Sequence, residues 1–474
     1  MKKKLLRAAA GDQLTTLEEA VRGGKRIALC GLREAQAAFI ASWLAEETGL
    51  RVLFVTANDI RAVHAADDAQ QLLLSGTACL PGGELDLTRG ASSHESSWQR
   101  LETLTRMCAG HVRLLTTSMD ALMQRMGSAD SFRASILRLA PGDTIRPDSL
   151  IRRLVRMGYE RADKVEGKGQ CALRGSILDV YPPSASQGLR IEFFDDEVDS
   201  IRALDCITQR SLDKQKEALL SPASEVLLDP EKAEDAATRM RRSLHRMVKV
   251  TDAEPALFAD LPPLPEDDED DEAYFDAQVA PKVKAKTLSA SREAEMGHRI
   301  SSLASDAELV ADGLPFRRIR AWLTVLTDET STLLDWYRPQ VVVFSEPDGL
   351  RERARERLAG FAEDLKGAME RGEAVREQEK LLMDWDELTA GLTDLPVVAT
   401  CDLLRGLGGL QPDTVLDLHS KGLPGYGSQV KLLAEDLRTW RQKGMTVALL
   451  TGGVSRGRRL LQSLAEQEVQ AEFL

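Results

Sequence analysis

The chain has 474 residues, too many for one hydrophobic core, so its length predicts about three domains. Its hydrophobic content of 43% and charged content of 29% are ordinary for soluble globular protein, and no apolar run approaches the ~20 residues of a membrane span. The net charge of −13 disfavours a phosphate-binding surface over the whole chain, and the basic start is too short for a signal peptide. We therefore expect a cytoplasmic protein with a protein partner.

The six cysteines and the six histidines are dispersed along the chain. No Cys-x-x-Cys pair occurs, which argues against a disulfide framework and against a zinc site, so we expect no metal ion. Neither a Gly-x-Ser-x-Gly elbow nor a Cys/His pairing stands out as a catalytic cluster. The acidic trio Asp195, Asp196 and Glu197 could hold a metal or serve acid/base chemistry, but acids at a strand end are more typical of a turn.

In residues 1–140, short apolar runs alternate with helical patterns. The runs at 26–31, 51–57 and 112–118 are separated by stretches of helical periodicity, and Asn58 is a suitable N-cap for the helix that follows the second run. Strands separated by helices predict a parallel sheet covered on both faces.

Near Pro141 the pattern changes to that of a compact α+β unit. An amphipathic helix at about 148–158 is followed by CALRGSILDVYPPSASQGLRIEFFDDEVDSIR, residues 171–202. This stretch predicts two strands around the Pro-Pro-Ser-Ala-Ser-Gln-Gly connection, which has the composition of a hairpin loop.

Alternation along the second strand of this hairpin separates an apolar face from an unusual one. Arg190, Glu192 and Phe194 lie on the unusual face, with Arg174 expected on the facing strand. An exposed aromatic between arginines is typical of a protein interface, whereas the alternative makes Phe194 a second core layer under the preceding helix. The apolar face consists of Leu189, Ile191 and Phe193.

The later part of the chain is mostly helical. Residues 260–286 contain DLPPLPEDDEDDEAYFD, predicted as a solvated loop, although an acidic cluster could instead bind a cation or mimic nucleic acid. RPQVVVFSEP, from residue 338, predicts a buried strand. MTVALLTG, residues 445–452, predicts a strand between helices and thus a small separate α/β domain.

Residues Gly31, Leu32, Arg33 and Glu34 follow a strand at the place where a nucleotide-binding fold carries its phosphate loop. A working loop needs glycines, a lysine for the phosphates and a hydroxyl for Mg²⁺, and no Gly-Lys-Ser/Thr occurs here. Ser345 stands where a Mg²⁺-coordinating acid would be expected. We predict a degenerate nucleotide loop and no catalysis by this segment.

A long, ordered set of residues in the α+β unit resembles the second domain of the bacterial transcription-repair coupling factors (Mfd), a domain shared with the excision-repair protein UvrB. Later segments, such as STLLDWYRPQVVVFSEP, look like the same family, so the resemblance spans nearly the whole chain. UvrB keeps a complete phosphate loop and an aromatic hairpin that are not visible here, which favours the coupling factors. The matching residues are Gly158-Tyr159, Val165-Glu166, Arg174-Gly175, Asp179, Pro182, Arg190-Ile191-Glu192, Phe194 and Thr208-Gln209-Arg210-Ser211.

The resemblance implies a fold and its division into domains. A RecA/UvrB-like α/β domain with a parallel sheet and a degenerate nucleotide site is expected from residues 1–140 and 224–392. An α+β domain that binds the excision-repair protein UvrA is expected as an insertion at 141–223, and a small α/β domain at 393–474.

The resemblance also implies a function. It assigns UvrA binding to Arg174, Arg190 and Phe194, so that the module recruits UvrA where RNA polymerase has stalled at a lesion. RNA polymerase and double-stranded DNA would be bound by the family's downstream domains, whose ATP- and Mg²⁺-dependent motor would lie beyond Leu474. This segment would then need no cofactor and be no enzyme; the alternative is an active, ATP-dependent damage-binding enzyme of the UvrB type.

Overall fold

The computed structural model describes residues 13–72, 76–85, 87, 94–250, 303–404, 406–418, 425–427, 429–449, 451 and 453–473. The acidic stretch within residues 260–286 lies outside the described residues. None of the described helices is long and apolar enough to cross a membrane.

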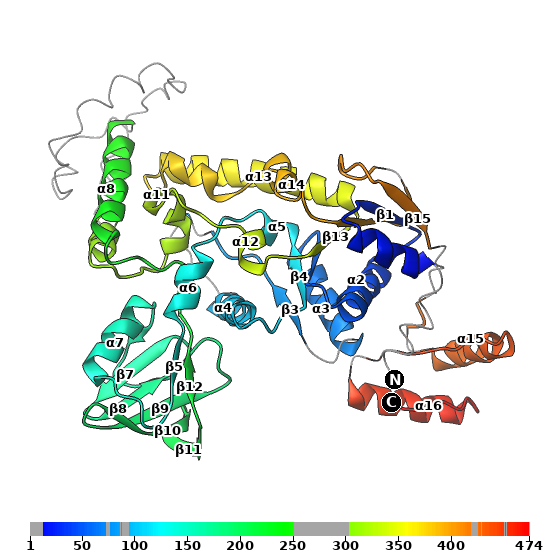
Figure 1. Ribbon diagram of the computed structural model, residues 1–474, viewed down its shortest axis with the longest axis horizontal. Helices are drawn as coiled ribbons and strands as arrows, with labels where there is room; N and C mark the ends of the chain where they lie inside the picture. Colours follow the sequence, from blue (N-terminus) through cyan, green and yellow to red (C-terminus); the bar gives the residue numbers. More distant parts are fainter. Residues whose placement is uncertain are drawn as a thin grey trace.

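A parallel seven-stranded sheet forms the largest part of the fold (Figure 1), in the order β15-β1-β14-β13-β2-β4-β3. All its strands except β15 are buried, as expected where helices cover both faces. The strands are β1 (Ile27–Cys30), β2 (Val52–Thr56), β3 (Thr77–Leu80), β4 (Leu114–Ser118), β13 (Val341–Ser345), β14 (Val397–Thr400) and β15 (Thr414–Asp417).

Helices pack on both faces of this sheet and create two cores. Alternation along β2 directs Val52 and Phe54 into the core under α2 (Glu34–Thr48) and α3 (Asp59–Leu72), and Leu53 and Val55 into the larger core opposite. Asn58 accepts a hydrogen bond from the Arg61 amide at 3.0 Å, which confirms the predicted cap. The larger core is covered by α4 (His94–Cys108), α5 (Met119–Leu122), α8 (Ala233–Val250), η3 (Ile319–Trp322), α11 (Leu323–Leu326), α12 (Leu333–Tyr337), α13 (Pro347–Glu370), η4 (Arg376–Leu381) and α14 (Trp385–Ala390).

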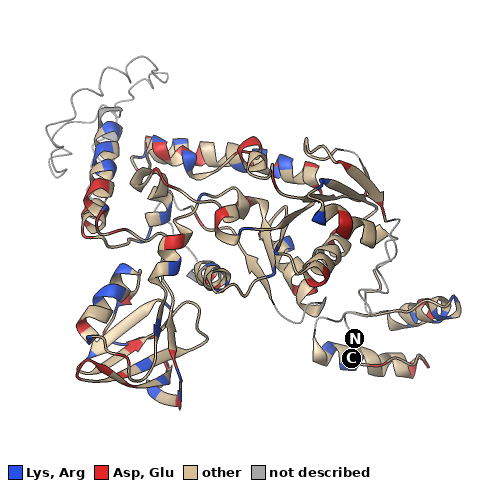
Figure 2. Ribbon diagram, viewed as in Figure 1, with Lys and Arg blue, Asp and Glu red and all other residues tan. Residues whose placement is uncertain are grey.

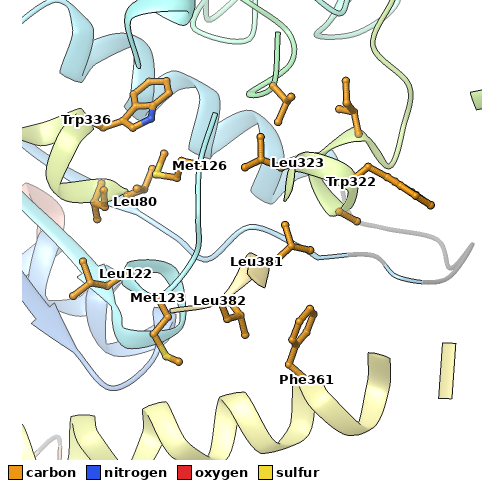
Figure 3. Packing of buried hydrophobic residues seen from close by; sticks show 14 of the residues in the cluster. Leu80, Leu122, Met123, Met126, Trp322, Leu323, Trp336, Phe361, Leu381 and Leu382 are labelled. Atoms are coloured by element: carbon orange, nitrogen blue, oxygen red, sulfur yellow. The ribbon is translucent and has the colours of Figure 1, made fainter. Parts of the chain in front are cut away.

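The larger core joins segments that are far apart in the sequence. Figure 3 shows Leu122 and Met123 packed near Leu382 and Phe361, which come from the second half of the chain. Both halves therefore build one domain, and the α+β unit between them is an insertion.

The inserted domain is a sheet with one helix packed on its inner face (Figure 1), and the sheet is antiparallel except for the parallel pair β6–β7. The chain follows α6 (Ala129–Ser135) and enters through β5 (Leu137–Leu139), which pairs antiparallel with the exit strand β12 (Ala218–Leu220). α7 (Pro147–Arg156) buries Leu150, Ile151 and Leu154 against the sheet. The sheet order is β11-β10-β9-β8-β7-β6. These strands are β6 (Glu160–Arg161), β7 (Gln170–Arg174), β8 (Ile177–Val180), β9 (Gly188–Phe194), β10 (Glu197–Asp205) and β11 (Arg210–Lys214).

The predicted fold class is confirmed, with two corrections near the C-terminal end. β14 and β15 both pair with β1, so the large sheet continues past the predicted boundary at residue 392. Residues 445–449, predicted as a strand, carry no strand hydrogen bonding in the described chain, and Met445 is 57% exposed. A strand exists only through its hydrogen-bonded neighbour, and the described residues supply none to this apolar run. α15 (Val430–Gln442) and α16 (Val454–Glu466) pack together beside it.

Candidate docking site on the inserted domain

Phe194 is an exposed aromatic at the end of β9. The side chains of Leu189, Ile191 and Phe193 lie in the domain core, whereas that of Phe194 is 78% exposed. The predicted alternation is confirmed, and the alternative that placed Phe194 in a second core layer is wrong. Asp195 follows in a left-handed conformation (φ 56°) and forms the turn into β10 with Asp196, as the sequence favoured, while Glu197 is the first residue of β10.

Arg174 does not lie on the strand that faces β9. It ends β7, and Gly175 (φ 61°) then reverses the chain so that β8 lies between β7 and β9. The expectation of a facing strand was wrong because the segment from Cys171 to Val180 contains a tight turn at Gly175-Ser176.

A carboxylate that the sequence interpretation gave no role brings the two arginines together. Asp179, on β8, has no exposed side-chain surface and accepts hydrogen bonds from Arg174 Nη2 at 2.5 Å and from Arg190 Nε and Nη2 at 2.7 and 2.8 Å. Alternation along β8 gave a signal for this contact, since Asp179 lies on the face opposite buried Leu178 and Val180, directly beside Arg190.

The two arginines differ in how much of each remains open to a partner. Arg190 is 13% exposed, and its Nη1 also donates to Gln209 O at 3.3 Å and to Ser211 Oγ at 3.2 Å. Its hydrogen bonds to Asp179 raise the pKa of Arg190 above the ordinary value, so it stays charged. Arg174 is 45% exposed. Arg190 is thus held rigidly between Asp179 and the segment at Gln209 and Ser211, while Arg174 has the more accessible guanidinium.

The exit of the inserted domain holds a second, buried cluster of the same composition. Glu225 accepts from Arg100 Nε at 2.7 Å and Nη2 at 3.1 Å, and Arg320 Nε lies 3.7 Å from its carboxylate. Burial raises the pKa of Glu225, but Arg100 and Arg320 outweigh it and hold that pKa at about 2. Burial and the charge of Arg100 lower the pKa of Arg320 to about 10, so Glu225 and Arg320 are both ionised at neutral pH. This cluster ties the exit segment to α4 and η3.

In the predicted degenerate nucleotide loop, two backbone amides bond to the residues that follow β14. The amide of Gly31 (φ 76°) donates to Asp402 O and that of Leu32 to Cys401 O, both at 3.1 Å. These are the groups that a phosphate loop directs at its ligand. Glu34 lies 3.5 Å from Arg61 and adds a negative charge at the start of α2.

The other half of the predicted nucleotide site lies at the end of β13, around Ser345 and Glu346. Glu346, after β13, accepts from the Asp402 amide at 2.9 Å, and Ser345 is buried. In the described ranges, His, Cys, Asp and Glu side chains nowhere gather in a group of three that could hold a metal ion. Figure 2 shows basic and acidic residues interspersed along the elements of both domains.

The inserted domain matches a known family. Residues 137–226 match the family described as the UvrB interaction domain, against the predicted limits of 141 and 223. The candidate docking residues Arg174, Arg190 and Phe194 all lie within this match.

The whole chain is similar to transcription-repair-coupling factors, which confirms the resemblance inferred from its motifs. It is 25% identical to that of Bacillus subtilis (strain 168) over 453 residues, covering 95% of this chain and 35% of the relative. It is 32% identical to that of Myxococcus xanthus over 243 residues, covering 49% of this chain and 20% of the relative. The chain thus spans about a third of the length of the Bacillus relative.

Proposed function

We propose that this chain is a docking module of transcription-coupled nucleotide excision repair that binds UvrA through Arg174, Arg190 and Phe194. The observation that carries the proposal is Phe194, 78% exposed on a sheet whose neighbouring arginines are fixed by a buried carboxylate. Exposed aromatics and arginines on rigid frames are typical anchors of protein interfaces. The match to the UvrB interaction domain and the name of the relatives support repair as the context.

The wider setting of this docking is part of the same proposal. Relatives named transcription-repair-coupling factor are about two and a half times as long as this chain. Contacts with RNA polymerase and double-stranded DNA, and an ATP-driven motor, would belong to the parts of the relatives that this chain does not cover. The role of the present segment is then to hold UvrA close to the stalled polymerase.

The test is a titration of purified UvrA against the chain and its variants. Phe194→Ala and Arg174→Ala should each weaken binding by about thirtyfold, or ~2 kcal/mol, with little change in the melting temperature. Phe473→Ala and Arg138→Ala, which truncate exposed residues outside the docking face, serve as matched controls and should bind as the parent does. Parental affinity of both docking variants would contradict the proposal.

A nucleotide measurement separates this function from an active enzyme of the UvrB type. Because the amides of Gly31 and Leu32 already donate within the chain, and no lysine follows them, we propose that the segment binds no ATP. Excess ATP-Mg²⁺ should leave the melting temperature unchanged, since only a ligand that prefers the native state raises it. A rise of several degrees would favour the enzyme instead.

A further inference from the structure

The turn between β10 and β11 presents the most exposed large apolar side chain in the described part of the chain. Ile207 is 95% exposed, more than Phe194 itself. Single exposed apolar residues are common on protein surfaces and need no explanation by themselves. The construction of this turn is what distinguishes Ile207.

Hydrogen bonds on both sides of Ile207 fix the turn. The Asp205 carboxylate accepts from the amides of Ile207 and Thr208 at 2.9 and 3.2 Å, and from Thr208 Oγ1 at 2.7 Å. Gln209 has a left-handed backbone (φ 59°), and its side-chain amide donates to Cys206 O at 2.8 Å and Val165 O at 2.9 Å. A left-handed residue other than glycine persists only where its surroundings hold it. An exposed isoleucine is therefore held on a stiff support.

The same turn is joined to the candidate docking residues. Arg190 Nη1 donates to Gln209 O and to Ser211 Oγ, so the guanidinium held by Asp179 also braces the turn. Phe194 pairs with Glu197 at one end of the β9–β10 ladder, which puts it ~13 Å from Arg190 at about 3.3 Å per residue. The turn follows the other end of this ladder, so Arg190 lies between Phe194 and Ile207 along it.

We propose that Ile207 is a second apolar anchor of the docking face, at the opposite end from Phe194. The proposal rests on the proposed function and names UvrA as the occupant, because the turn and the arginine pair form one continuous hydrogen-bonded frame. A face of roughly 25 Å built in this way has the extent of a standard interface patch of ~800 Å² per partner. The complementary surface of UvrA would then carry acidic groups between two apolar depressions.

The experiment compares two isoleucines that are exposed on different domains. Ile207→Asp and Ile207→Ala in the full chain should each weaken binding to purified UvrA, the aspartate variant by about tenfold or more. Ile60→Asp makes the same change at a residue 70% exposed on α3, and should bind as the parent does. Phe194→Ala combined with Ile207→Ala should multiply the two losses, since distant sites are close to additive.

The outcomes separate this inference from the function on which it rests. Parental binding by both Ile207 variants, while Phe194→Ala binds weakly, overturns the second anchor and leaves the docking function standing. Parental binding by the Ile207 and Phe194 variants alike overturns both. If Ile207→Asp melts well below the parent, Ile207→Ala decides: weaker binding at the parental melting temperature supports the anchor, and parental binding overturns it.

Discussion

Two carboxylates in this chain each lie between two arginines, and the two clusters differ mainly in their access to water. Around Glu225 every side chain is nearly buried, with Arg320 the most exposed at 14%. Around Asp179 the carboxylate is equally buried, but Arg174 is 45% exposed. One cluster lies at the exit of the inserted domain and the other on its outer face.

The difference shows that the residue types in an ion cluster do not decide whether mutating it changes stability or affinity. In a dry interior, an ion left without its partner is strongly destabilising, so the Glu225 cluster fixes one arrangement of the chain. At the surface, a half-exposed guanidinium keeps donors for a partner and can still be hydrated when alone, which fits the proposal that the Asp179 cluster orients residues for binding. We therefore expect mutations of the first to change stability and mutations of the second to change affinity.

The largest expected effect is that of Glu225→Gln. The substitution leaves Arg100 and Arg320 buried without a counter-charge and should lower the free energy of unfolding by about 3–5 kcal/mol. Denaturant titration measures it, and UvrA affinity at a temperature where the variant is folded should be unchanged. Equal denaturation midpoints for variant and parent would remove the distinction between the two clusters.

Lowering the pH should remove the stabilisation that the ionised Glu225 carboxylate provides. The pKa of Glu225 is held at about 2, below its ordinary value of 4.5, so the stabilisation is present above pH ~4.5 and is lost as the pH falls toward 2. The shift corresponds to about 3 kcal/mol at neutral pH. The difference in denaturation midpoint between parent and Glu225→Gln should therefore shrink from pH 7 to pH 3, whereas a constant difference would show that the carboxylate is not the cause.

Asp179→Asn tests the more exposed cluster, that of Asp179, Arg174 and Arg190. Arg174 and Arg190 lose their counter-charge and one of the two oxygens that accept from them, so UvrA affinity should fall by about tenfold, while stability falls by only about 1 kcal/mol because Arg174 remains hydrated. Asp199→Asn removes the same charge from an exposed site on β10 and is the matched control. Tighter binding by Asp179→Asn would mean that Asp179 competes with UvrA for the arginines.

The smallest change in stability is expected for a solvent-exposed ion pair, which extends the comparison beyond the two clusters. Glu217 and Arg138 lie 3.5 Å apart at the root of the inserted domain and are 57% and 63% exposed. Glu217→Gln should change the free energy of unfolding by less than about 0.5 kcal/mol, with parental UvrA affinity. A loss as large as that of Glu225→Gln would show that exposure is not the controlling variable.

Local patterns predicted the parts of this fold that depend on a few consecutive residues. Alternation along β9 correctly predicted that Phe194 is exposed, because side chains point to opposite faces in turn along any strand. The prediction placed Arg174 on the wrong strand because it missed one tight turn at Gly175. An apolar run of this composition can form either one strand or a hairpin of two.

Long-range pairings left no comparable signal. Nothing in the short apolar runs of β14 and β15 tells that their partner is β1, at the other end of the chain. Glu225 likewise meets Arg100 across 125 residues, and neither residue type is unusual for its surroundings in the sequence. The contact of Asp179 with Arg190 likewise required the observed register of β8 beside β9.

The insertion has a consequence for the order in which the protein acquires its structure during synthesis. Among the described strands, β1 pairs only with β14 and β15, so it has no neighbour until residue 397 has been made. The inserted domain is completed just after β12, where Ser221 O accepts from Tyr159 and the Ala223 amide donates to Met157 O. At roughly 5–20 residues per second, the docking face is complete on the order of ten seconds or more before the sheet that supports it can close. In the nascent chain, the proposed docking face forms first.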